Sequence, residues 1–154
     1  MSTKHFLIIN GPNLNMLGIR EPEVYGSGTY DELCALIKEH AVAIGVRVSF
    51  YQSNHEGDLV DVIQKSRGNA DGIVINAGAY THTSVALLDA LRAAGTPAVE
   101  VHISDLNERA EAEPFRAVSY LRAACIGTVM GHGFRGYCEA LDMLASAVGP
   151  SETV

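Results

Sequence analysis

Five short runs rich in β-branched residues alternate along this chain with segments of helical periodicity. The expected strands cover residues 5–10, 46–52, 72–77, 97–103 and 125–131. Most of these runs are apolar without regular alternation, which indicates burial on both faces and therefore a parallel sheet. Strands that alternate with helices predict an α/β doubly wound domain of flavodoxin type, with helices on both faces and the strand order 2-1-3-4-5.

The segments between these runs have apolar residues spaced three and four apart, as in an amphipathic helix. We expect helices over residues 30–44, 56–66, 83–94 and 136–148. The first begins with a capping-box pattern, because Thr29 is followed three residues later by Glu32. Gly45, Gly68 and Gly95 stand where helices should end, since glycine readily adopts the left-handed backbone of a helix C-cap.

The length and composition predict one globular domain over residues 1–154, with only residues 149–154 frayed. A formal net charge of −7 argues against nucleic-acid or anionic-membrane partners, because both require a basic face. The sequence shows no leader and no run long enough to span a bilayer, so we expect a cytoplasmic, reduced protein. Cys34, Cys125 and Cys138 form no C-x-x-C pair, and we expect all three to be buried as small apolar residues.

The connection after the first strand is unusually long and polar. Residues 9–26 are rich in glycine, proline and asparagine, whereas most strand-to-helix connections have about two to six residues. We interpret this loop as a lid over the ligand end of the sheet, where open α/β sheets bind their ligands. Arg20 and Tyr25 lie on it, and a positive charge beside a tyrosine stabilises the phenolate, which can act as a base.

The third and fourth strands end in polar residues. Asn76 precedes the small residues 77–79, which would let a carboxylate approach backbone N–H groups at the start of a helix; the alternative is a turn or cap residue. A period of two puts Glu100 and His102 on one face of the fourth strand, where polar residues are costly unless paired. A carboxylate can orient a histidine and favour the protonated form that a general acid needs. The alternative is a structural histidine bonded to a nearby loop.

Two other patterns carry no function in this interpretation. Residues 131–136 spell G-x-G-x-x-G, but the acidic partner of a dinucleotide site would lie about 20 residues on, along a second strand, so tight strand–helix packing explains the glycines better. Lys4, Lys38 and Lys65, the chain's three lysines, all lie away from the expected ligand end, which argues against Schiff-base chemistry.

The stretch NGPNLNMLGIREPEVYG, residues 10–26, closely resembles the N-terminal signature of the type II 3-dehydroquinate dehydratase family. Later family blocks follow in order at residues 53–64, 72–91, 99–104, 115–121 and 131–141, so the resemblance covers nearly the whole chain. It implies a cofactor-free lyase that interconverts 3-dehydroquinate and 3-dehydroshikimate through an enolate. The implied setting is the shikimate pathway, which leads to chorismate and the aromatic amino acids, or quinate breakdown.

The resemblance also implies roles for the residues that catalyse the reaction. Tyr25 looks like the base that removes the C2 proton, Arg20 like the group that keeps it as phenolate, and Asn13 like the residue that positions a water on the enolate. His102 resembles the acid that protonates the departing C1 hydroxyl, with Glu100 orienting it.

The implied substrate-binding residues are Asn76, His82, Asp89, Ile103, Ser104 and Arg116. Asn76 would bind the carboxylate and nearby oxygens together with the backbone of Ile103 and with Ser104, while His82 and Arg116 would bind the ring hydroxyls. Asp89 would reach a neighbouring subunit's site, since the family forms trimers gathered into dodecamers.

One segment departs from the family pattern S-N-x-x-x-R-E-x-F-R. Residues 104–116 are about three residues longer and more acidic, which leaves Arg109 without an assigned role. Phe115 and Ser119 flank Arg116 as the family pattern does, and this favours Arg116 as the binding arginine.

The residues leave two other hypotheses open. A metal-dependent hydrolase or lyase would use His82, Glu100 and His102 as ligands. A non-catalytic flavodoxin-like binding module would show no turnover, and the loss of Tyr25 would cost it nothing.

Overall fold

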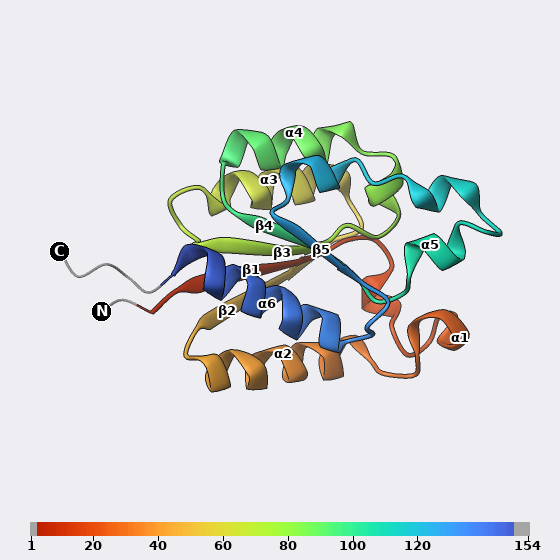
Figure 1. Ribbon diagram of the computed structural model, residues 1–154, viewed down its shortest axis with the longest axis horizontal. Helices are drawn as coiled ribbons and strands as arrows, with labels where there is room; N and C mark the ends of the chain where they lie inside the picture. The colour runs from red at the N-terminus through yellow and green to blue at the C-terminus, as the bar shows by residue number, and fades with distance from the viewer. Residues whose placement is uncertain (1–2, 150–154) are drawn as a thin grey trace.

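A five-stranded parallel sheet forms the centre of the computed structural model, which describes residues 3–149 (Figure 1). Its strands are β1 (His5–Asn10), β2 (Arg47–Gln52), β3 (Gly72–Asn76), β4 (Ala98–His102) and β5 (Gly127–Met130). They lie in the order β2-β1-β3-β4-β5, which confirms the predicted flavodoxin-like arrangement. Of the tail expected to fray, residues 150–154 lie outside the described part of the chain.

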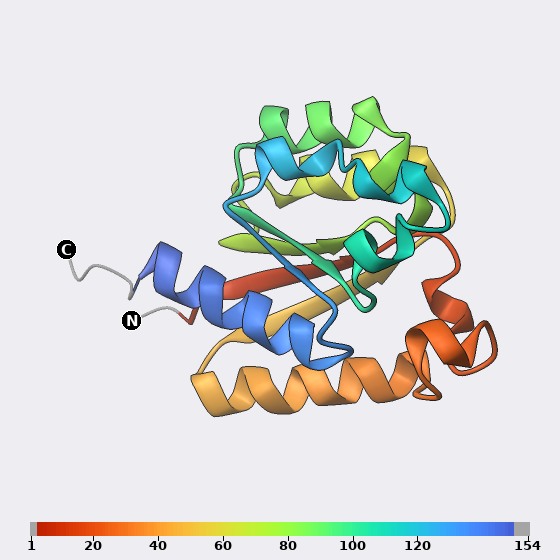
Figure 2. The ribbon, with the colours of Figure 1, turned by 45° about the vertical axis from the view of Figure 1, so that its right-hand side comes forward.

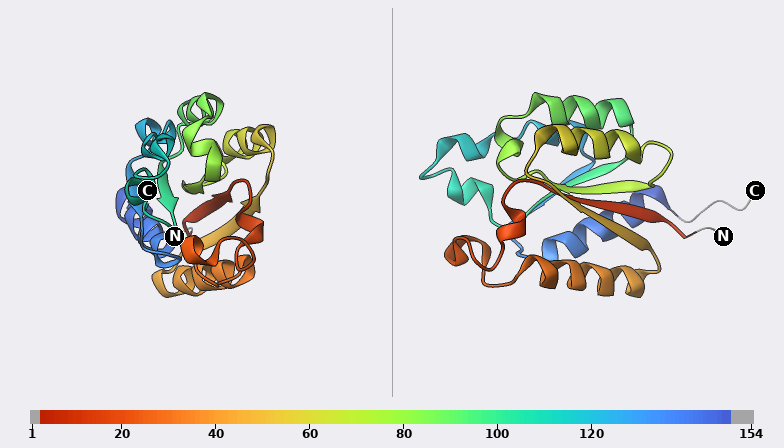
Figure 3. Two further views of the ribbon diagram at one scale, coloured as in Figure 1. Left: turned by 90° about the vertical axis from the view of Figure 1, so that its right-hand side faces the viewer. Right: turned by 180° about the vertical axis from the view of Figure 1, so that it is seen from behind.

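Four long helices cover the two faces of the sheet, as predicted. Figure 3 shows α2 (Tyr30–Ile44) and α6 (Arg135–Val148) on one face, and α3 (Glu56–Ser66) and α4 (Val85–Ala94) on the other. The helix α4 begins two residues later than expected because Ser84 is its N-cap, and the Ser84 side chain accepts a hydrogen bond from Leu87 N at 3.0 Å.

The predicted helix caps are confirmed at Thr29, Gly45 and Gly95. Thr29 accepts a hydrogen bond from Glu32 N at 3.1 Å and caps α2. Gly45 and Gly95 are C-caps with φ of 74° and 69°, and Gly68 lies one residue beyond the C-cap of α3.

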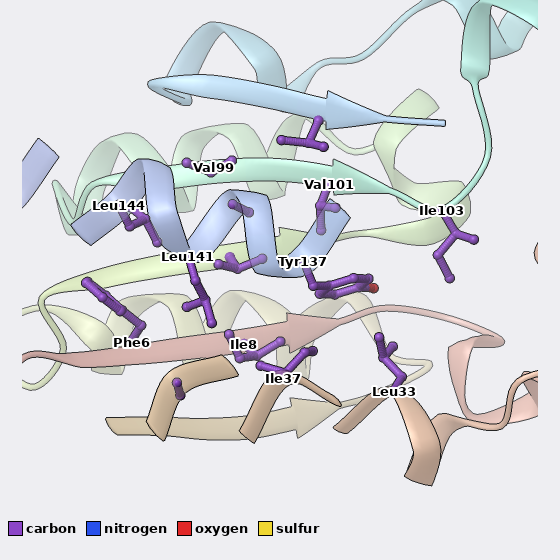
Figure 4. Packing of buried hydrophobic residues seen from close by; sticks show 14 of the residues in the cluster. Phe6, Ile8, Leu33, Ile37, Val99, Val101, Ile103, Tyr137, Leu141 and Leu144 are labelled. Atoms are coloured by element: carbon purple, nitrogen blue, oxygen red, sulfur yellow. The ribbon is translucent and has the colours of Figure 1, made fainter. Parts of the chain in front are cut away.

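Two apolar layers form the core, one on each face of the sheet. Alternate residues of β1 point to opposite faces: Phe6 and Ile8 pack with α2 and α6, and Leu7 and Ile9 pack with α3 and α4. Figure 4 shows the first layer, in which Tyr137 lies among aliphatic side chains of the sheet and of both helices.

Short helical segments gather at the carboxyl ends of the strands. They are η1 (Leu14–Met16), α1 (Pro22–Tyr25), η2 (Gly78–His82), α5 (Leu106–Arg109) and η3 (Pro114–Ala117), whereas a further short segment, η4 (Leu121–Ala124), packs on α4 and leads into β5. In Figure 1, α1 and α5 both lie beyond the strand ends, on the side opposite the two chain termini, and Figure 2 brings this side of the molecule forward. Sequence periodicity did not predict them, because three to five residues are too few to show a helical period.

The glycine-rich turn after β5 serves packing, as predicted. A Cβ on Gly136 would lie 3.3 Å from side-chain atoms of Val101 and of Val129, so only glycine lets the first turn of α6 come this close to the sheet without displacing them. Within residues 3–149, α6 is the last element, and no second strand–helix–strand unit follows the turn.

Among the helices of residues 3–149, none has both the length and the apolar character needed to cross a membrane.

Candidate active site

An open pocket lies at the carboxyl ends of β1, β3 and β4. The residues singled out from the sequence that line it are Asn13, Arg20, Tyr25, Asn76, His82, His102, Ser104 and Arg116. They come from the lid segment after β1, from the ends of β3 and β4, and from the longer segment after β4. The fold therefore brings together most of the residues that the sequence indicated.

Behind the pocket, a fully buried carboxylate holds the histidine of β4. Glu100 Oε2 lies 2.9 Å from His102 Nε2 and also accepts from the Ser119 hydroxyl. Its other oxygen, Oε1, accepts from Arg122 Nε at 3.0 Å and from Thr128 Oγ1 at 3.2 Å. Every side-chain partner therefore stabilises the carboxylate. The last three were not predicted, because they reach Glu100 from η4, from β5 and from the loop before η4.

These bonds fix the charge of Glu100 and the orientation of His102. Burial by itself would raise the pKa of Glu100, but the bonds from His102 and Ser119 and the charge of Arg122 outweigh it and lower the pKa from 4.5 to about 2. Glu100 is therefore a carboxylate at neutral pH. Because Glu100 occupies Nε2, Nδ1 is the His102 nitrogen that can exchange a proton with a ligand in the pocket.

Two arginines surround Tyr25, the last residue of α1. Arg109 Nη1 donates to the Tyr25 hydroxyl at 3.1 Å and to Ser104 Oγ at 3.3 Å. Arg20 lies over the ring, with its Cζ 4.5 Å from the centroid, and pairs with Glu21 at 3.2 Å. Both guanidinium groups favour a negative charge on the phenol, but it is Arg109 that contacts the oxygen.

Arg109 lines the pocket and contacts Tyr25, although the sequence left it without a role. The signal was present, because Ser104 and Arg109 keep the spacing of the family pattern S-N-x-x-x-R and the extra residues follow Arg109. Within that insertion, Glu113 Oε1 accepts from Arg116 Nε at 3.0 Å and lies 4.0 Å from Arg109 Nη2. The longer segment thus keeps both arginines at the pocket.

Asn13 enters the pocket from a strained backbone position. Its φ of 69° is left-handed, which few residues other than glycine and asparagine adopt. Its N–H donates to Asn54 Oδ1 at 3.0 Å, and Gln52 Nε2 binds Gly11 O at 3.2 Å and Asn54 Oδ1 at 3.3 Å. The ends of β1 and β2 therefore hold this part of the lid in place.

The side-chain amide of Asn76 faces the pocket and is also bound to the protein. Its Oδ1 accepts from Gly78 N at 3.1 Å, and its Nδ2 donates to the Tyr137 hydroxyl at 3.0 Å. Asn76 is therefore a turn residue, as the alternative interpretation expected, because its Oδ1 closes the turn after β3. The same residue leaves one Nδ2 hydrogen for a ligand.

His82 has the character of a neutral hydrogen-bond acceptor. Burial and the positive charges nearby lower its pKa below 6.5, against the opposing effect of the Val118 carbonyl, which lies 2.6 Å from Nδ1. The carbonyl can only accept, so Nδ1 carries the proton and Nε2 is the acceptor. Such a nitrogen suits a ligand hydroxyl.

Some predicted residues do not line this pocket. Asp89 is exposed on α4, and the Ile103 side chain is buried in the core, so only the Ile103 backbone is available to a ligand. None of the three lysines or three cysteines lines it either. The expectation that all three cysteines are buried is wrong for Cys34 and Cys125, which are half-buried. Burial raises the pKa of the thiol in both, to about 12 in Cys125.

The residues of the metal hypothesis do not form an open ligand set. Both oxygens of Glu100 are taken up by donors that include Arg122, and His82 Nδ1 is bound to Val118 O. Across residues 3–149, no three His, Cys, Asp or Glu side chains are grouped so that they could hold a metal ion.

Comparisons with known proteins agree with this geometry. A family model described as dehydroquinase class II matches residues 4–145. A protein of Clostridium acetobutylicum named 3-dehydroquinate dehydratase is 49% identical over 138 residues, which are 90% of this chain and 94% of that protein. An Aspergillus clavatus protein named catabolic 3-dehydroquinase is 50% identical over 142 residues, covering 92% and 93% of the two chains.

Comparison with solved structures points to the same family. The crystal structure of a type II dehydroquinase from Butyrivibrio crossotus superposes with a TM-score of 0.89 at 48% identity, covering 94% of this chain and 99% of that one.

The Glu100 network makes stability depend on pH in a defined direction. A carboxyl with a pKa of about 2 in the folded state and 4.5 in the unfolded chain contributes on the order of 3 kcal/mol above pH 4.5, and this contribution is lost as the pH falls towards 2. Urea unfolding should therefore find Glu100→Gln less stable than the parent at pH 7, with a smaller difference at pH 3. The exposed Glu111→Gln is the control. If Glu100→Gln lowered the free energy of unfolding by the same amount at both pH values, the result would contradict this account.

Proposed function

The chain belongs to the class II dehydroquinase family and is a hydro-lyase that acts on 3-dehydroquinate, and we propose that Tyr25 and His102 are the base and the acid of its reaction. One observation carries the assignment. The Tyr25 hydroxyl, held by Arg109, and His102, held by Glu100, line the same pocket. Two guanidinium groups lie around the first side chain, and a buried carboxylate lies behind the second, so the two groups have the different surroundings that an acid–base pair requires.

The proposed reaction has two proton transfers. The Tyr25 phenolate removes the C2 proton next to the ketone, and the electron pair moves onto the carbonyl oxygen to form an enolate. Asn13 positions a water that stabilises this oxygen. His102 Nδ1 then gives a proton to the C1 hydroxyl, which leaves as water while the C1–C2 double bond forms. Tyr25 ends protonated and His102 neutral. Solvent then takes the proton from Tyr25 and returns one to His102, which restores both groups.

The proposed binding roles follow the chemistry of the lining residues. Asn76, the Ser104 hydroxyl and the backbone of Ile103 would hold the substrate carboxylate, to which all three can donate hydrogen bonds. His82 Nε2 would accept from a ring hydroxyl, and Arg116, held by Glu113, would donate to a ring oxygen. No residue is assigned to a cofactor, because the α-proton of a ketone is acidic enough for this route.

We further propose a cytoplasmic homo-oligomer built from trimers, with a dodecamer as the full assembly. The support is that Asp89 is exposed on α4, outside the pocket of its own chain, and can therefore serve a neighbouring site. Relatives carry both biosynthetic-type and catabolic names, so shikimate and quinate roles both fit.

Loss of the base should nearly abolish turnover. Tyr25→Phe should lower kcat by about 10²–10⁴-fold, the usual effect of removing a positioned base, with substrate binding largely intact. Arg109→Ala should lower kcat more than Arg20→Ala, because only Arg109 contacts the phenol oxygen. Steady-state kinetics on purified variants measures both. The matched control is Tyr51→Phe, a half-buried tyrosine outside the pocket. A Tyr25→Phe enzyme that keeps more than about a tenth of the parent rate would rule Tyr25 out as the base.

An enolate route predicts no covalent adduct on lysine. Borohydride traps enzymes that form an imine with their substrate, and here no lysine lines the pocket. Treatment with borohydride and 3-dehydroquinate should leave activity unchanged, with no substrate-sized mass added to the protein. A reduced adduct found by mass spectrometry on Lys4, Lys38 or Lys65 would overturn the mechanism even if the reaction were correct.

A shared site predicts that activity requires assembly. Light scattering at assay concentration should find a trimer or a multiple of three. Asp89→Ala should raise KM, whereas Asp61→Ala, an exposed acidic residue on α3, should not. A fully active monomer would disprove the shared site.

A further inference from the structure

The hydroxyl of Tyr137 lies directly beneath the pocket, and the proposed reaction does not use it. Tyr137 is in the first turn of α6 and is fully buried. Figure 4 shows its ring against the sheet with the oxygen towards the carboxyl ends of the strands. The hydroxyl lies 2.6 Å from Asn10 Oδ1 and 3.0 Å from Asn76 Nδ2. These asparagines are register partners at the ends of β1 and β3.

The three side chains form a hydrogen-bond chain with one possible direction. Gly78 N–H can only donate, so Asn76 must turn its Oδ1 towards it and its Nδ2 towards Tyr137. Tyr137 therefore accepts from Asn76 and gives its own proton to Asn10. Burial raises the pKa of Tyr137, so the hydroxyl keeps the proton that this arrangement needs.

We propose that Tyr137 is a positioning residue for the reaction, and that its hydroxyl fixes the amide plane of Asn76 so that the second Nδ2 hydrogen points at the substrate. A planar amide held at Oδ1 by Gly78 and at one Nδ2 hydrogen by Tyr137 has no rotational freedom left. The inference rests on the proposed function, in which Asn76 binds the substrate carboxylate.

Core filling alone does not account for this side chain. A phenylalanine would fill the same space, and a buried hydroxyl costs free energy unless it is hydrogen-bonded. Here both of its bonds go to strand-end amides, one of which lines the pocket. The glycine-rich turn gains a purpose as well, because Gly136 lets α6 approach the sheet closely enough for the next residue to reach under the site.

The test separates binding from turnover. Tyr137→Phe should raise KM for 3-dehydroquinate about tenfold, the effect of losing one well-placed hydrogen bond, with kcat changed less than about threefold. In an Asn76→Ala background, which itself raises KM, Tyr137→Phe should add nothing, because the residue acts only through Asn76. Ser66→Ala is the matched control: it removes a buried hydroxyl that binds Ile63 O and Thr96, away from the pocket. It should lower stability and leave KM unchanged.

Each outcome decides the inference. An unchanged KM in folded Tyr137→Phe, or an equal further rise in the Asn76→Ala background, would overturn it. If Tyr137→Phe does not fold, Asn10→Ala takes its place, since it keeps the tyrosine but removes the acceptor of its proton; KM should again rise, and an unchanged KM overturns the proposal. A parent protein with no dehydratase activity would defeat the proposed function itself, whereas an active parent with unchanged KM in the variants defeats only the role of Tyr137.

Discussion

The arrangement of the site depends on one buried carboxylate. Glu100 has no exposed surface, and a charge taken out of water is strongly destabilising unless it is paired and hydrogen-bonded. Its partners come from β4, from β5, from η4 and from the loop before η4, so these parts must assemble around it together. The same bonds orient His102. Folding and the placement of the proposed acid therefore have a common cause.

Opposite charges on the two sides of the pocket give the two proposed proton-transfer groups different surroundings. On the lid side, Arg109 and Arg20 place positive charge around Tyr25. On the sheet side, Glu100 places a negative charge behind His102. These different surroundings are the basis for proposing Tyr25 as the base and His102 as the acid. Tyr25 and Arg109 are 84 positions apart in the sequence, so Arg109 holds the phenol oxygen only in the folded chain.

The sequence predicts the features that depend on neighbouring residues, and it does not predict those that depend on contacts between distant residues. The five strands and the four long helices rest on periodicity, the strand order follows from the flavodoxin-type fold that their alternation predicts, and Asn76 and His102 follow from their places at strand ends. The partners of Glu100 and the role of Tyr137 could not be predicted, because they depend on contacts between residues 19 to 127 positions apart. Arg109 lies between these cases. Its spacing from Ser104 is visible in the sequence, but its hydrogen bond to Tyr25 joins distant segments and appears only in the folded structure.

The central claim is that this pocket removes water from 3-dehydroquinate with its own side chains. The direct measurement is the absorbance of the conjugated enone of 3-dehydroshikimate, followed with purified, exhaustively chelated protein. The account predicts that the rate of absorbance increase is proportional to protein concentration and is the same before and after chelation. A folded, assembled protein that produces no enone, or one whose rate disappears on chelation and returns with added metal, would contradict it.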